Sequence, residues 1–158
     1  MIIVGGVGGG HLSSTESINE YNGLTCNIPS FPYGLFGHSS TITPSGILVC
    51  GGETKSYGYT NRCYLYKKST SSWHTFPSMT TTRYSFDMIY QNEGVWAIGG
   101  SEGSGSLTSM DYFDITRNIW AKQSIPMNVK RHCLTKISND KIILIAGEQN
   151  GQVSKMRT

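Results

Sequence analysis

The sequence predicts an all-β protein built from repeated propeller blades, and three observations support this prediction. A short apolar run ends in a pair of small residues four times along the chain, at residues 3–6, 49–52, 97–100 and 145–147. Successive pairs lie 46, 48 and 47 residues apart. No helical pattern separates these strand-like runs. A strand-rich period of this length is typical of repeat units that bury their faces only against neighbouring units.

The chain length sets the number of blades. With 158 residues, it holds about three and a third repeats, whereas a closed propeller needs roughly four to eight four-stranded blades. We expect a partial blade at 1–36, blades at 37–83 and 84–131, and a second partial blade at 132–158. Cut blades would expose unpaired strand edges and apolar faces. The missing blades are therefore expected from the rest of a longer chain or from a second subunit.

The repeats share further positions besides the glycine pair. An aromatic residue follows the pair by about 14 residues, a tryptophan comes seven residues later in two repeats, and a proline follows. Glycine permits a positive φ and the close approach of a neighbouring backbone, and large aromatics fill the gap between twisted sheets. The expected order is an inner strand, a strand ending in glycines, a strand with the aromatic, and an outer strand with the tryptophan. These positions are held by Tyr21, Tyr66 and Phe113, by Trp73 and Trp120, and by Pro77 and Pro126.

This set of positions resembles the kelch family of β-propellers over nearly the entire chain. The resemblance rests on the double glycine, the spaced Tyr/Phe and Trp, and the Met/Pro run that precedes Arg83 or Arg131. The first repeat departs from the pattern with Ile28 in the tryptophan position, and the last has Ala146 in place of the first glycine. A WD-type propeller is the rival, but its period is shorter and the chain has no Trp-Asp dipeptide. The resemblance implies a kelch-type propeller.

Composition excludes two classes of partner. Charged residues make up 15% of the chain and the net charge is +3, so no field of the strength that attracts nucleic acid or an anionic membrane is present. No apolar run approaches the roughly 20 residues of a membrane span. The first four residues, followed at once by glycines, lack the basic flank and the length of a signal peptide.

Cys50 and Cys63 occupy matching points of adjacent predicted strands. In neighbouring repeats these two positions are apolar, so a cross-strand apolar pair has been exchanged jointly for two thiols. Directly opposed residues of adjacent strands come close to disulfide distance, and we predict that the two are bonded. Two buried free cysteines are the alternative. A disulfide favours an oxidising, extracellular location over a cytoplasmic one. The neighbouring apolar pairs are Val4 with Ile18 and Ile98 with Met110.

The other cysteines and the histidines give no metal pattern. Cys26 and Cys133 lie in unrelated positions and their state stays open. His38 and His132 occupy equivalent positions, with Tyr84 between them in the series, and we interpret both as filling the inner strands. No Cys-x-x-Cys or clustered Cys/His spacing supports zinc, and we expect no metal.

Arg83 and Arg131 are placed at one repeat position, which the kelch resemblance locates near the mouth of the central channel. In kelch adaptors an arginine there often grips a carboxylate of a bound peptide, because a guanidinium offers a planar bidentate fork. The structural alternative, bonds to backbone carbonyls of the neighbouring blade, stays open. Loops after the glycine pairs open on the same face and supply further partner-binding candidates. These are Glu53, Tyr57, Tyr59, Ser101, Glu102, Glu148, Gln149 and Asn150.

The predicted function is non-enzymatic recognition. The glycine-rich stretch at 6–10 lacks the spacing and the following helix of a phosphate loop, and no Gly-x-Ser-x-Gly elbow occurs. We predict a module without cofactor that binds a protein or peptide, of acidic type, through Arg83, Arg131 and loop aromatics. The alternative is part of a secreted propeller enzyme acting on carbohydrate, of the oxidase or mutarotase type. Galactose oxidase has this fold, but its copper-binding set of tyrosines and histidines cannot be assembled from the residues present.

Overall fold

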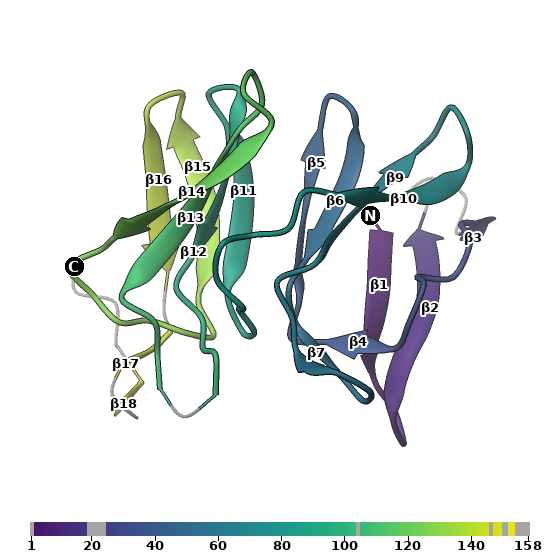
Figure 1. Cartoon of the computed structure of the whole chain (residues 1–158), viewed down its shortest axis with the longest axis horizontal. Coiled ribbons are helices and arrows are strands. Elements are labelled where there is room, and N and C mark those ends of the chain that lie inside the picture. Colours follow the sequence, from purple (N-terminus) through teal and green to yellow (C-terminus); the bar gives the residue numbers. More distant parts are fainter. Residues whose placement is uncertain (1, 19–24, 104, 146, 150–151, 154–158) are drawn as a thin grey trace.

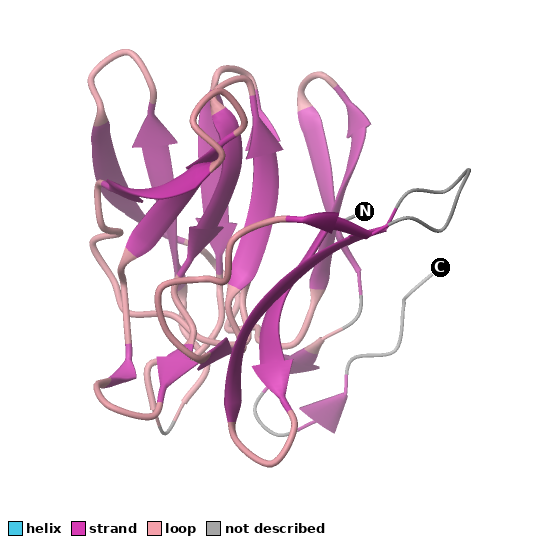
Figure 2. Ribbon diagram, turned by 90° about the vertical axis from the view of Figure 1, so that its right-hand side faces the viewer, coloured by secondary structure: helices cyan, strands magenta, loops and turns pink. Residues whose placement is uncertain are grey.

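The protein consists of β-strands joined by turns and loops (Figures 1 and 2). The structure, a computed structural model, describes residues 2–18, 25–103, 105–145, 147–149 and 152–153, and this part contains no helix. The all-β prediction is therefore confirmed. Tyr21, Ala146 and Asn150 from the sequence analysis lie outside the described residues.

Two complete four-stranded antiparallel sheets form the middle of the structure. The first has the order β10-β9-β6-β5, and the second has the order β11-β12-β13-β14. In each sheet the chain runs from one edge to the other, which is the strand order that the repeats predict. The first sheet contains β5 (Ser39–Thr43), β6 (Gly46–Cys50), β9 (Cys63–Lys67) and β10 (Ser72–Phe76). The second contains β11 (Asp87–Gln91), β12 (Gly94–Ile98), β13 (Ser109–Asp114) and β14 (Ile119–Ser124).

Smaller sheets flank these two. One side carries a three-stranded sheet of β1 (Ile2–Val7), β2 (His11–Ile18) and β3 (Thr25–Asn27), and the other a pair of β15 (Cys133–Ser138) and β16 (Lys141–Ile145). The inner strand β11 lies against both β5 and β15, so successive sheets stack as blades of a propeller. Short strands gather at the end where the glycine pairs lie (Figure 1). They are β4 (Leu35–Phe36), β7 (Glu53–Thr54), β8 (Gly58–Tyr59), β17 (Glu148–Gln149) and β18 (Gln152–Val153).

The first glycine of each pair fits against the backbone of the next blade. Gly51 has a φ of 66°, and a Cβ added there would lie 2.5 Å from the carbonyl oxygen of Arg83 and 2.6 Å from the ring of Phe86. A Cβ at Gly99 would lie 2.3 Å from the carbonyl oxygen of Val129. Any side chain at these positions would separate the blades. The sequence interpretation of the glycine pairs as sites of close backbone approach is therefore confirmed.

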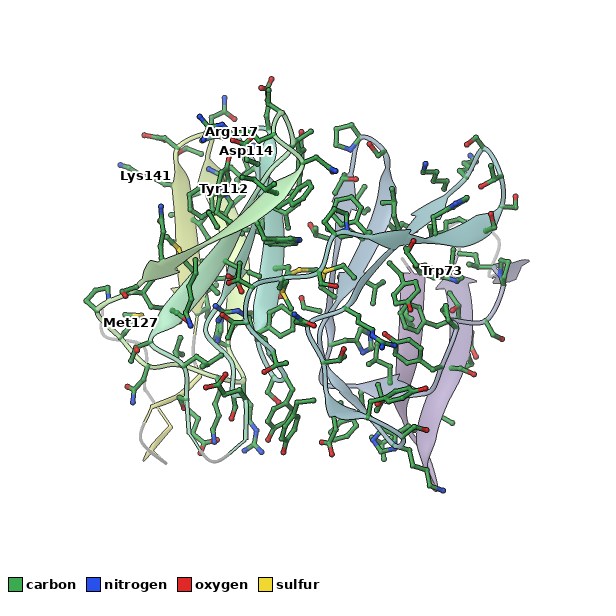
Figure 3. The ribbon with its side chains drawn as sticks, in the orientation of Figure 1. Trp73, Tyr112, Asp114, Arg117, Met127 and Lys141 are labelled. Atoms are coloured by element: carbon green, nitrogen blue, oxygen red, sulfur yellow. A yellow bond between two sulfur atoms is a disulfide. The ribbon has the colours of Figure 1, made fainter. Side chains whose placement is uncertain are left out.

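The outer strands are tied by the predicted tryptophans. Trp73 donates from Nε1 to the carbonyl oxygen of Pro29 at 2.9 Å, and Trp120 donates in the same way to Pro77 at 2.8 Å (Trp73 is labelled in Figure 3). Each bond joins an outer strand to the segment that closes the preceding blade. The ring of Trp120 also packs on Phe113, with 5.2 Å between centroids. The apolar core between the two complete sheets includes both aromatic rings.

The inner strands show which residues are equivalent between blades. Gly37, Ser85 and Arg131 all have left-handed backbones, with φ of 64°, 54° and 54°, just before an inner strand. The amide of Ser85 donates to the carbonyl of Gly37 at 2.7 Å, and that of Arg131 to the carbonyl of Ser85 at 2.8 Å. The three residues therefore form one backbone ladder across three blades.

This ladder corrects the alignment of the two arginines. The amide of Gly52 donates to the carbonyl of Arg83, and that of Gly100 donates to the carbonyl of Val129, both at 2.7 Å. Arg83 is therefore equivalent to Val129, and Arg131 is equivalent to Ser85. The predicted equivalence of Arg83 with Arg131 is wrong by two positions. The physical reason is loop length, because residues 77–86 join β10 to β11 whereas the shorter segment 125–132 joins β14 to β15.

We expect Gly51→Ala to destabilise the protein far more than Gly58→Ala. Both glycines have a φ of 66°, but nothing lies within 4 Å of a Cβ added at Gly58. Gly58→Ala should cost about 1–2 kcal/mol from the left-handed backbone alone. Gly51→Ala should cost about 1–3 kcal/mol more from the collision. Denaturant unfolding of both variants measures the difference, and equal losses would contradict the role of Gly51 in the blade contact.

Candidate functional site

The candidate site lies at the glycine end of the blades, where loops from successive repeats meet. The small sheet β4-β7-β8 and the pair β17-β18 both lie at this end (Figure 1). The Gly37–Ser85–Arg131 ladder runs beside them along the inner strands. Most of the predicted partner-binding residues belong to these segments, but the structure places them in different environments.

Arg83 is fully buried and makes an internal set of bonds. Its Nε lies 3.0 Å from Asp111 Oδ2, and Nη1 donates to the carbonyls of Gly99 and Ser109 at 2.7 Å each. Nη2 donates to Ser109 Oγ at 3.0 Å. Burial lowers the pKa of Arg83, and the charge of Asp111 opposes that shift. The expectation that Arg83 contacts a partner is corrected, since its donors are used inside the fold in the structural role that the sequence left open.

Asp111 is the buried acceptor that the sequence analysis missed. Besides Arg83, it accepts hydrogen bonds from the Thr80 hydroxyl and from the amide of Thr81, the latter at 3.2 Å. Its own side chain has no exposed surface. Three donors from the segment before β11 therefore converge on one carboxylate of β13, which fixes that segment against the sheet.

The loop candidates also divide into buried and exposed residues. Ser101 is fully buried, and its hydroxyl bonds to the backbone of Gly103, so the expectation of a partner contact is corrected for this residue too. Tyr57, Tyr59 and Glu102 are exposed, Tyr57 by 69%. The side chain of Gln149 and all of Asn150 lie outside the described residues.

Arg131 is exposed at the glycine end of the blades. Its side chain is 63% accessible, and Nη1 lies 2.8 Å from Glu148 Oε2. Lys130 Nζ lies 3.6 Å from the other oxygen of the same carboxylate. Two cations therefore share one anion and leave a local positive charge. Ser85 is the equivalent of Arg131 in the neighbouring blade, and the sequence analysis missed it because its register was two residues out.

A row of rings crosses three blades at the glycine end. Tyr59 stacks on Tyr84 with 4.8 Å between centroids and 24° between planes. Tyr84 meets Phe36 at 6.4 Å, and Phe36 meets His11 at 4.9 Å. Phe36 and Tyr84 each directly precede a residue of the backbone ladder, and this shared position is the feature by which the sequence could have revealed them.

The inner strands are joined by one carboxylate. Asp87 of β11 accepts from Ser39 Oγ at 2.8 Å through Oδ1 and from the amide of Leu134 at 2.7 Å through Oδ2. Ser39 lies in β5 and Leu134 in β15, so Asp87 links three consecutive blades. The sequence analysis did not identify this residue, because nothing in the repeat pattern marks it.

The predicted disulfide between Cys50 and Cys63 is present in the structure. The two residues are register partners of β6 and β9, and both are buried. Cys133 is free and exposed, while the side chain of Cys26 lies outside the described residues.

His38 and His132 occupy equivalent positions, and Phe86 lies between them in the series rather than Tyr84. Each histidine ring faces the first glycine of the preceding blade, at Gly5 and at Gly99. Burial lowers the pKa of His38 to about 4 and also lowers the pKa of His132.

Within the described ranges, no three His, Cys, Asp or Glu side chains gather as they would to hold a metal ion. The same residues include no helix long and apolar enough to cross a membrane.

Comparison with known proteins bears on the class of this fold. No family model matches the chain. Kelch-like protein 36 of Bos taurus is 29% identical over 117 residues, which are 73% of this chain and 19% of that protein. Kelch-like protein 38 of Mus musculus is 25% identical over 143 residues, 85% of this chain and 24% of that protein. Kelch-like protein 7 of Rattus norvegicus is 32% identical over 76 residues, 48% of this chain and 13% of that protein. The chain therefore spans less than a quarter of the length of these relatives.

Four-stranded antiparallel blades, stacked through glycine pairs around their inner strands, define a protein of the β-propeller class. Among propellers, the shared repeat positions and the kelch-like relatives decide the family. The chain belongs to the kelch-repeat family.

We expect Asp111→Asn to destabilise the protein by about 3–5 kcal/mol, since it leaves the buried charge of Arg83 without its partner. The matched control is Asp114→Asn, which breaks the ion pair between Asp114 and Arg117, whose side chain is 76% exposed. That change should cost less than about 1 kcal/mol. Denaturant unfolding at neutral pH measures both. A small loss for Asp111→Asn would contradict the structural role assigned to Arg83.

We expect stability to fall as the pH drops from about 6.5 towards 4. The folded state holds the pKa of His38 at about 4, below the unfolded value of 6.5, so in this window the unfolded chain binds more protons. The free energy of unfolding lost through His38 is about 3 kcal/mol at most. In the variant His38→Phe, which copies Phe86 of the next blade, the free energy of unfolding should depend less on pH over this range. An unchanged pH dependence would contradict the assignment.

Proposed function

We propose that this chain is part of a kelch-repeat module that binds a protein or peptide at the glycine end of its blades. The observation that carries the proposal is Arg131, an exposed guanidinium at the glycine end that already holds a carboxylate. A carboxylate of a partner can replace Glu148 as the acceptor of the Arg131 guanidinium. The partner segment is therefore acidic at this point.

Neighbouring side chains support a protein ligand rather than a small molecule. Tyr57 and Tyr59 are exposed at the same end, and Arg62 lies over the ring of Tyr57 at 5.2 Å from its centroid. Tyrosine and arginine are the residue types that most often dominate the binding energy of protein interfaces. Glu102 adds an exposed polar contact beside them.

The blades would run from 37 to 83 and from 84 to 131, with partial blades at 1–36 and 132–158. The remaining blades of the ring are supplied by further chain or by a second subunit. The support for this proposal is that a propeller needs at least roughly four blades to close, whereas two four-stranded sheets are described here.

We expect Arg131→Ala to weaken binding to acidic peptides by about tenfold or more, because one charge-assisted hydrogen bond contributes about 1.5–3 kcal/mol. The assay is an array of Asp- and Glu-rich peptides, each paired with its Asn or Gln counterpart. The control is Arg117→Ala, which removes another exposed arginine from its carboxylate partner at the opposite end of the blade (Figure 3).

Thermal unfolding shows whether Arg131→Ala leaves the blades folded, as its exposure predicts. Equal binding of acidic and amide peptides by the unchanged protein, or equal losses in the two arginine variants, would contradict the proposal.

A further inference from the structure

Glu53 lies between two aromatic residues of the small sheet at the glycine end. In the register of β4, β7 and β8, it is opposite Phe36 on one side and opposite Tyr59 on the other. Directly opposed residues of antiparallel strands project from the same face, with Cβ atoms about 4.5–5.5 Å apart. The carboxylate of Glu53 and the two rings therefore share one face of this sheet.

Tyr84 adds a third ring to the group. It reaches this sheet from the loop before β11, stacks on Tyr59 at 4.8 Å, and meets Phe36 edge to face at 6.4 Å and 70°. Three rings from three separate segments thus lie together, and two of them are directly opposite one acidic side chain. Desolvation, followed by the negative charge of Glu53 and the proximity of Tyr84, raises the pKa of Tyr59, as this crowding requires.

The carboxylate of Glu53 has no cation of its own among the described residues. The acidic residues that form ion pairs in the described part of the chain are Asp111, Asp114 and Glu148. The nearby Arg62 is directed to the ring of Tyr57 instead. Glu53, Phe36 and Tyr84 are partly exposed and Tyr59 is 36% exposed, so solvent reaches the group.

Aromatic faces attract cations through the negative charge of their π-systems, and a carboxylate beside them adds a full opposite charge. We propose that Phe36, Glu53, Tyr59 and Tyr84 form a cation-binding subsite, which takes the ammonium or guanidinium group of a basic side chain on a partner protein. This inference rests on the proposed protein-binding function and extends it. The partner would present an acidic residue to Arg131 and a basic residue to this subsite.

The opposite charges of Arg131 and the subsite fix the orientation of a bound segment. Arg131 belongs to the backbone ladder just before β15, and the subsite lies on the small sheet β4-β7-β8 and the loop before β11. A segment with both charges can bind in one orientation only, since the reverse orientation places like charges together at both points. Like-charge contacts at an interface are strongly unfavourable.

The test uses Nα-acetyl-lysine methylamide as the probe and follows the aromatic resonances of the protein by NMR during a titration. We expect the probe to shift resonances of Phe36, Tyr59 and Tyr84. The same compound acetylated at Nε, which is neutral, should leave them unchanged. Glu53→Gln should lower the affinity for the probe by about threefold or more, in line with the strength of cation–π and surface charge interactions.

Two variants keep the test decisive. Glu93→Gln makes the same charge change at the exposed turn before β12, at the opposite end of the blade, and should leave binding unchanged. Tyr84→Leu should abolish the shift that the probe causes in the Tyr59 resonances. Glu53→Gln keeps the shape of the side chain, and thermal unfolding should show that this variant remains folded. Equal binding of the neutral compound, no shift with the charged probe, or equal losses for the two glutamate variants would each overturn the subsite. If Arg131→Ala does not change the binding of acidic peptides, the charged probe should still shift these resonances. The two proposals can therefore fail separately.

Discussion

The contact between each glycine pair and the following blade is the constraint on which the rest of the structure depends. A Cβ at Gly5, Gly51 or Gly99 would lie within 2.5 Å of a carbonyl oxygen of the next blade. No helix covers the sheets of the described residues, so each sheet buries its faces only against its neighbours. The tryptophan bonds at the outer edge and the Asp87 bonds at the inner edge can form only when the glycines allow the sheets this close.

This constraint also gives the backbone of the Gly37–Ser85–Arg131 ladder a different role from its side chains. Gly37, Ser85 and Arg131 hold the blades together through their amides and carbonyls, so the fold needs their backbone conformation, whereas the side chains at Ser85 and Arg131 differ. A glycine, a serine and an arginine therefore occupy equivalent positions. Ser85 and Arg131 show that residues other than glycine occur at these positions in spite of the cost of a left-handed backbone, so the side chain there can differ from blade to blade.

Arg83 and Arg131 show how a two-residue offset decides the role of an arginine. Arg83 is buried, and its guanidinium makes four hydrogen bonds, one of them to a carboxylate. These bonds offset the desolvation of the charge, because a buried ion is tolerated only when its donors are satisfied. Arg131 remains hydrated and shares Glu148 with Lys130, so it keeps the freedom to exchange that carboxylate for another.

The sequence by itself determined the strand order, the glycine contacts, the two tryptophans and the Cys50–Cys63 pair. All of these occupy positions that recur at fixed offsets in each blade, where hydrogen-bonded strands keep the spacing constant. Only the tertiary structure decided the equivalence of Arg131 with Ser85, the burial of Arg83 on Asp111, and the assembly of Phe36, Glu53, Tyr59 and Tyr84. These depend on loops between blades, whose length differs from one repeat to the next, and on contacts between segments that no local period relates.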